Sequence, residues 1–120
     1  NIDSGMFRAM QLAAATALEA EADWYEGNNE NYRNRRHLAG EIMKTLGCTY
    51  DEKQVGMFLW GKIPASCKDV EELTEKVLHE ARVFITPGFI FGSNGARYIR
   101  ISLCCKDNKL AEALERIKRI

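Results

Sequence analysis

Hydrophobic residues recur at helical spacing in two stretches of the first third of the chain. The first covers residues 6–18, with alanines crowded on one face and Ser4 as a candidate N-cap, and the second covers residues 32–46. Gly47 follows the second stretch, where a left-handed C-terminal cap is expected. The polar stretch 19–31 contains Gly-Asn-Asn at its centre and predicts a break between the two helices.

Two further helices are predicted in the second half of the chain. Ser66 stands three residues before Asp69, which is the spacing of a capping box, and residues 70–81 then carry an amphipathic pattern. Asp107 opens the last helix, whose apolar positions continue to Ile117.

Three stretches have the composition of strands. Residues 54–62 are rich in large apolar side chains, 83–86 form a short apolar run that ends at Pro87-Gly88, and 98–104 alternate. The turn signal at 92–95 indicates that the last two strands pair antiparallel across a connection longer than a tight hairpin. The element order predicts an α+β two-layer sandwich. It would have a three- or four-stranded, mostly antiparallel sheet with helices on one face, preceded by a long N-terminal helix region.

The last predicted strand carries an arginine where it is least expected. Alternation places Ile99, Ile101 and Leu103 on the face that helices would cover, and Arg100 on the other face with Tyr98, Ser102 and Cys104. Arg100 is then either a solvated side chain on an open sheet face or a guanidinium aimed into a cleft. In a cleft, its planar fork would bind a carboxylate or phosphate through two parallel hydrogen bonds.

The strand 54–62 bears on this choice because both of its faces are apolar. Phe58 and Trp60 share one face, and Met57 and Leu59 share the other. A one-sided sheet does not need this, so the second face is expected to abut another domain or subunit. Arg100 would then point at a partner or a site.

Composition limits the remaining possibilities. A length of 120 residues with 46% hydrophobic residues fits one domain, and 17 basic residues balance 17 acidic ones. This balance disfavours nucleic-acid and membrane partners, and no apolar run approaches the roughly 18 to 20 residues of a membrane span. A cytoplasmic location is expected. The chain begins at Asn1 and is expected to be part of a longer protein.

The cysteines and histidines do not have the pattern of a metal site. The four cysteines are expected to be reduced, since nothing indicates an oxidising compartment, and none is paired as Cys-x-x-Cys. His37 and His79 are predicted to be structural or exposed. Arg33, Arg35 and Arg36 are interpreted as a solvated helix face rather than an anion-binding patch, and Arg97 is predicted to be exposed.

Three motifs in the last third of the chain resemble a known family. They are Val-Phe-Ile-Thr-Pro-Gly at 83–88, Phe-Gly at 91–92 and Tyr-Ile-Arg-Ile-Ser-Leu at 98–103. Together they resemble the C-terminal signature of the class I and II aminotransferases, the aspartate-aminotransferase-like pyridoxal-phosphate enzymes of fold type I. The resemblance covers residues 1–120, which would form a single domain corresponding to that family's C-terminal small domain.

The resemblance implies specific roles. Arg100 falls on the arginine that binds the α-carboxylate of the amino-acid substrate. Independently of the resemblance, Tyr98 and Ser102 share its strand face and are candidates to orient it, although packing within the strand explains them as well. Asp3, Ser4 and Gly5 fall where relatives send a loop to the active site of the partner subunit in a homodimer, although a capped helix start explains them as well.

The resemblance also implies what this chain lacks. The family's Schiff-base lysine and most of its pyridoxal-phosphate contacts belong to the large domain, so no catalytic residue is expected among these 120 residues. The full enzyme would transfer an amino group between an α-amino acid and a 2-oxo acid, and this chain alone would be inactive. The alternative is a freestanding ferredoxin-like module that binds a small anion or another protein without catalysis.

Overall fold

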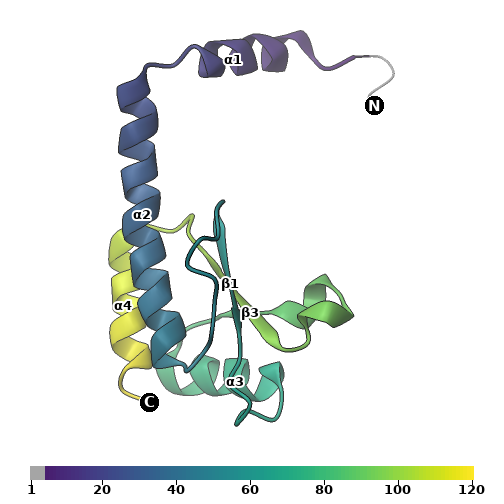
Figure 1. Cartoon of the computed structure of the whole chain (residues 1–120), viewed down its shortest axis with the longest axis vertical. Coiled ribbons are helices and arrows are strands. Elements are labelled where there is room, and N and C mark those ends of the chain that lie inside the picture. Colours follow the sequence, from purple (N-terminus) through teal and green to yellow (C-terminus); the bar gives the residue numbers. More distant parts are fainter. Residues whose placement is uncertain (1–4) are drawn as a thin grey trace. The chain divides into compact units, whose positions relative to one another are not determined.

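The computed structural model describes residues 5–120 of the chain and divides it into two compact units, Asn1–Asn31 and Tyr32–Ile120. Figure 1 shows the elements. The helices are α1 (Arg8–Leu18), α2 (Ala22–Thr45), α3 (Val70–Lys76) and α4 (Asp107–Ile117), and the strands are β1 (Phe58–Lys62), β2 (Thr86–Pro87) and β3 (Tyr98–Ser102). A π-helical turn, η1 (Val77–Ala81), extends α3, and two 3₁₀ helices, η2 (Gly88–Phe91) and η3 (Ser93–Gly95), separate β2 from β3.

The first unit differs from the sequence prediction in its boundaries. Helix α1 follows Phe7 as its N-cap, so the predicted cap at Ser4, a residue outside the described range, is not the start of this helix. The predicted break over 19–31 is also wrong, because only residues 19–21 separate α1 from α2. Gly27 and its two asparagines lie inside α2. Their weak helix propensity costs at most about 1 kcal/mol each, and the helix propagates through them because extending a formed helix is easier than starting one.

The C-terminal end of α2 has the predicted geometry. Gly47 has a φ of +68°, in the left-handed region that favours glycine. Its N–H donates to the carbonyl of Lys44 at 3.0 Å, and the N–H of Cys48 donates to the carbonyl of Met43 at 2.9 Å. These two bonds form a Schellman motif, which satisfies carbonyls left open at the end of the helix.

The sheet has three antiparallel strands in the order β1-β3-β2, which confirms the predicted α+β class. Strand β3 is central, with Trp60 of β1 and Thr86 of β2 on either side of Arg100. Strand β2 is shorter than predicted, because residues 83–85 do not pair. The described residues form no fourth strand. Beside β1 there is one isolated antiparallel bridge, between Thr49 and Lys62.

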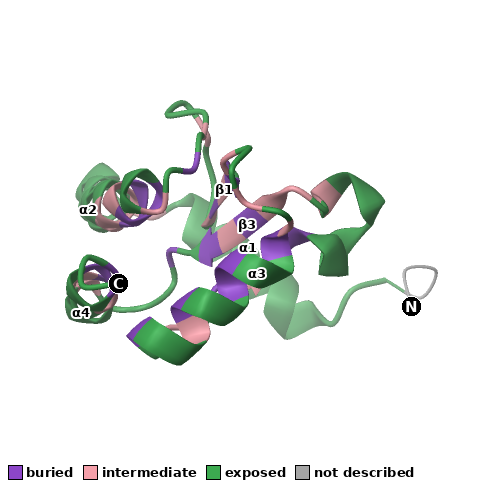
Figure 2. Ribbon diagram, turned by 90° about the horizontal axis from the view of Figure 1, so that it is seen from below, coloured by how far each residue is buried: buried purple, intermediate pink, exposed green. Residues whose placement is uncertain are grey.

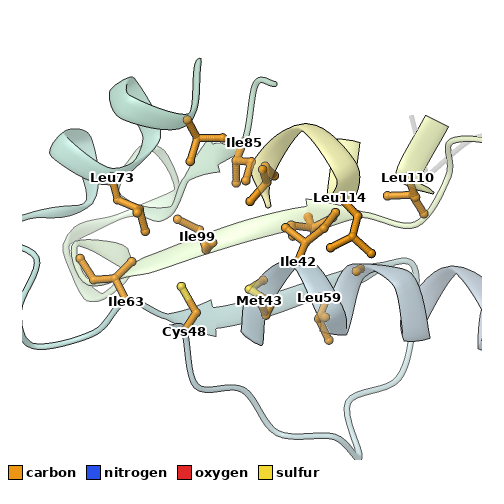
Figure 3. Packing of buried hydrophobic residues seen from close by; sticks show 14 of the residues in the cluster. Ile42, Met43, Cys48, Leu59, Ile63, Leu73, Ile85, Ile99, Leu110 and Leu114 are labelled. Carbon is orange, nitrogen blue, oxygen red and sulfur yellow. The ribbon is translucent and has the colours of Figure 1, made fainter. Parts of the chain in front are cut away.

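Helices cover one face of this sheet. Ile99 and Leu59 are fully buried there, with Ile42 and Met43 of α2 and Leu114 of α4 (Figure 3). Figure 2 shows buried residues along β3 and on the sides of the helices that face it. Burying a side chain of this size stabilises the fold by about 1.5–3 kcal/mol.

The N-cap of helix α3 lies three residues later than the predicted one. Its N-cap is Asp69 rather than Ser66, and the Asp69 carboxylate accepts a hydrogen bond from the N–H of Glu72 at 2.8 Å. The Glu72 carboxylate in turn accepts from the N–H of Lys68 at 2.9 Å. Asp is the better cap here because the carboxylate also interacts favourably with the helix dipole.

Candidate functional site

The face of the sheet opposite the helices carries the candidate site. In β3, Tyr98 and Arg100 are half-buried and Ser102 is exposed, whereas Ile99 and Ile101 between them are buried. This confirms the alternation expected from the sequence. Trp60 is the β1 residue opposite Arg100 in the antiparallel register, and it is half-buried on the same face.

Two phenylalanine rings hold the Arg100 guanidinium. Its central carbon, Cζ, lies over the Phe58 ring at 4.2 Å from the centroid and over the Phe91 ring at 4.0 Å. The Trp60 ring meets the Phe91 ring edge-on, with centroids 5.4 Å apart. Both guanidinium contacts are within the range of a cation–π interaction, in which the negative face of a ring attracts a positive charge.

The hydrogen-bonding groups of Arg100 have no partner among the described residues. None of these residues accepts a hydrogen bond from its guanidinium or forms an ion pair with it, whereas Arg35, Arg36 and Arg97 each have polar partners. Arg35 donates to Asp107 at 2.8 Å and to the Leu103 carbonyl at 3.2 Å, and Arg36 donates to the Gly56 carbonyl at 2.8 Å. A planar fork without a protein partner is suited to a carboxylate ligand.

Two sequence interpretations of arginines are wrong. Arg33 is exposed as expected, but Arg35 and Arg36 are half-buried and bind groups of the fold, so the three arginines do not form a solvated face together. Arg97 is not free in solvent, because its guanidinium donates to the backbone carbonyls of Pro64, Cys67 and Lys68, each at 2.8 Å. These carbonyls belong to the loop before α3, which the sequence pattern does not place near Arg97.

The segment that carries Phe91 is fixed by its glycines. A Cβ on Gly88 would lie 2.5 Å from the Gly95 carbonyl oxygen and 2.7 Å from that of Tyr98, so only glycine fits where these backbones meet. Gly92 has a φ of +121°, which L side chains rarely adopt. The Pro-Gly and Phe-Gly motifs therefore place the Phe91 ring beside Arg100.

Among the described residues, none of the other predicted site residues forms a hydrogen bond or ion pair with Arg100. Tyr98 and Ser102 share the face of Arg100, but neither hydrogen-bonds its guanidinium, and the Ser102 hydroxyl accepts instead from the N–H of Cys104 at 3.2 Å. Asp3 and Ser4 lie outside the described residues. Gly5 is exposed with a φ of +80°.

A cavity of about 290 Å³ lies near the end of β2. Arg100 and Ser102 are among its lining residues, but so are Ile42, Ile101 and Leu110, which belong to the helix-covered side. The cavity is therefore at the edge of the sheet, and we do not assign the carboxylate to it.

No lysine of this chain has the surroundings of a cofactor lysine. All eight are exposed, and Lys44, Lys109 and Lys118 pair with glutamates of their own helices. A lysine that forms a Schiff base is activated by a desolvated or cationic pocket, which these positions do not provide. The residues present therefore do not form a pyridoxal-phosphate site by themselves.

The cysteines are free, as expected from the sequence. Burial raises the pKa of the Cys48 thiol to about 11, with a smaller effect from Cys67. Within residues 5–120 there is no cluster of His, Cys, Asp and Glu able to hold a metal ion, and no helix long and apolar enough to cross a membrane.

Sequence reasoning missed the role of Phe91. It lies nine positions before Arg100 and outside any strand, so periodicity does not connect the two. The Phe-Gly motif was a signal that this position is special, but only the fold shows what the ring contacts.

Comparisons with known proteins show the family of this chain. A family model described as aminotransferase class I and II matches residues 4–117. This chain belongs to that family. Among curated relatives, it is 37% identical over 118 residues to LL-diaminopimelate aminotransferase of Desulforudis audaxviator, and 32% identical over 117 residues to transaminase BacF of Bacillus subtilis.

Solved structures of aminotransferases share the fold. Apo-BacF superposes with a TM-score of 0.73 at 33% identity over 96% of this chain, and an aromatic aminotransferase from Pyrococcus horikoshii superposes with a TM-score of 0.75 at 33% identity over 91%. The chain spans about 30% of the length of each of these proteins.

Proposed function

We propose that this chain is the C-terminal small domain of a pyridoxal-phosphate-dependent aminotransferase and that Arg100 binds the α-carboxylate of the substrate. The full enzyme transfers an amino group between an α-amino acid and a 2-oxo acid. The observation that carries this proposal is the guanidinium of Arg100, which is fixed by two rings while its fork has no partner among the described residues.

The chemistry of the ligand follows from that of the guanidinium. A carboxylate accepts two parallel N–H···O bonds from one arginine, and such charge-assisted bonds are about twice as strong as neutral ones. Anchoring the carboxylate also orients the Cα–H bond for reaction, so the contact contributes to the rate as well as to binding.

The proposal assigns the cofactor to residues beyond these 120. Pyridoxal phosphate supplies the electron sink for amino-group transfer in this family. Because all eight lysines here are exposed, its lysine and phosphate contacts are expected in a preceding large domain. The family resemblance further implies a homodimer, and a cytoplasmic location is expected. Asp3, Ser4 and Gly5 would then reach the partner subunit's site.

Changing Arg100 in the full-length enzyme tests the carboxylate assignment. Arg100→Gln should lower kcat/KM for an α-amino acid by about tenfold to several hundredfold, since a bidentate contact is lost in a site that excludes water. Arg100→Lys should recover part of this loss, because an ammonium keeps the charge but not the fork.

The matched substrate is the amine formed by removing the carboxylate from the same amino acid. Its turnover should change little in either variant, and the exposed Arg119→Gln should leave both substrates unaffected. Equal losses for the amino acid and the amine would show that Arg100 supports the fold and does not bind the carboxylate.

A second prediction concerns the chain by itself. Residues 1–120 should show no transaminase activity and form no stable adduct with pyridoxal phosphate, since every lysine is exposed. The measurement is the absorption of the purified chain after incubation with the cofactor and dialysis. A retained band that one lysine substitution removes would contradict this.

A further inference from the structure

The two rings at Arg100 come from separate parts of the fold. Phe58 is the first residue of β1, and Phe91 is the last residue of η2. Both reach the same guanidinium, at 4.2 and 4.0 Å from its central carbon, and Trp60 contacts the Phe91 ring from the side. The arrangement thus depends on three elements, because β3 supplies the arginine.

Burial of apolar area does not account for the position of Phe91. Its side chain is 49% exposed, and it is not part of the hydrophobic core. A half-exposed ring gains less from burial than a core ring does, yet its backbone is held there by Gly88 and Gly92. The specific contacts that this position provides are those with the Arg100 guanidinium and, edge-on, with the Trp60 ring.

An aromatic ring holds a guanidinium differently from a carboxylate or a carbonyl. Its face attracts the positive charge but offers no lone pair of the kind that occupies an N–H group. A carboxylate neighbour, such as Asp107 at Arg35, neutralises the charge and uses the hydrogen-bonding edge. Rings therefore restrict a long side chain while leaving its fork available to a ligand.

We propose that Phe58 and Phe91 are positioning residues that hold the Arg100 guanidinium ready for the substrate carboxylate. This inference rests on the proposed function, since it assumes that Arg100 binds that group. The rings act through the arginine and need not touch the substrate. They lower the entropy lost on binding by restricting the arginine before the carboxylate arrives.

Substitution of Phe91 in the full-length enzyme tests this role. Phe91→Leu keeps an apolar side chain but removes the π face, and it should lower kcat/KM for the amino acid about three- to tenfold, mainly through KM. The amine without a carboxylate should be unaffected. Phe91→Tyr restores an aromatic face and should restore the kinetics, and Phe89→Leu, on the same 3₁₀ helix but without an Arg100 contact, is the matched control.

A double-mutant cycle separates positioning from other roles. In an Arg100→Gln background, Phe91→Leu should not lower kcat/KM for the amino acid further, because Phe91 acts through the arginine that this background lacks. An unchanged loss in that background, or an equal loss for amino acid and amine, would overturn the proposal. So would full activity of Phe91→Leu, or failure of Phe91→Tyr to restore the kinetics while its melting temperature is unchanged.

The same experiment distinguishes this inference from the proposed function. If Arg100→Gln impairs the amino acid selectively while Phe91→Leu does not, only the positioning role is wrong. If Arg100→Gln has no selective effect, the carboxylate assignment fails and the positioning role fails with it.

Discussion

The two faces of the same short sheet serve different ends. On the helix-covered face, Ile99 and Leu59 are fully buried and belong to the hydrophobic core. On the opposite face, one residue away along each strand, Arg100 and Phe58 are partly exposed, and the Arg100 guanidinium lies over the Phe58 ring. The alternation of β structure thus lets five residues of β3 contribute to the core on one face and to the proposed carboxylate site on the other.

A comparison of two arginines contrasts a structural role with the proposed binding role. Arg97 and Arg100 lie three residues apart. The fork of Arg97 is occupied by three backbone carbonyls, so it fixes a loop, whereas the fork of Arg100 has no described partner. The two side chains thus differ in their hydrogen-bond partners within the described residues more than in their exposure, since both are half-buried.

The largest expected effect contrasts the two faces directly. Ile99→Ala should reduce the free energy of unfolding of the chain by about 2–5 kcal/mol, because it leaves a cavity among buried side chains. Phe58→Ala should cost only about 1 kcal/mol, since its ring is partly exposed. Urea denaturation of both variants measures the difference, and similar losses would mean that the open face is part of the stabilising core.

The next effect contrasts buried and exposed thiols. Because burial raises the pKa of Cys48 from 9.0 to about 11, its thiolate fraction at pH 8 should be about a hundredfold below that of an ordinary thiol. The folded state holds this proton more tightly than the unfolded state, so the stability that Cys48 contributes should fall as pH rises from 9 to 11.

The measurement uses dithionitrobenzoate at pH 8 on variants that each retain one cysteine. The variant with Cys48 should react at least about a hundredfold more slowly than the variant with exposed Cys104 or Cys105. Comparable rates would indicate that the region around Cys48 opens readily.

The smallest expected effect is the difference in stability between variants of Arg97 and Arg100. Arg97→Met should lower the free energy of unfolding by about 1.5–3 kcal/mol, because three carbonyls lose a charged donor. Arg100→Met should change stability by less, since it has no hydrogen bond to lose within the described residues. Thermal melting of both variants checks this, and a larger loss for Arg100 would assign it a structural role.

Local patterns predicted much of the fold. The Schellman cap at Gly47, the apolar face of α4 and the alternation around Arg100 each depend on neighbours within a few residues, so their spacing is visible in the sequence. The predicted break between the first two helices is too long, because the low helix propensity of Gly27 and its asparagines does not by itself end α2. The extent of β2 was also overestimated, since pairing depends on a strand distant in the chain.

The candidate site divides in the same way. The sequence by itself determined that an arginine lies among aliphatic residues on a strand and which face it occupies, because side-chain direction in a strand has a period of two. Only the tertiary structure decided what surrounds that arginine. Phe58 lies 42 positions before Arg100 in the sequence. The Phe91 ring is brought to Arg100 by the close approach of the Gly88 and Gly95 backbones. Contacts of that kind follow from the packing of whole elements, and no local period encodes them.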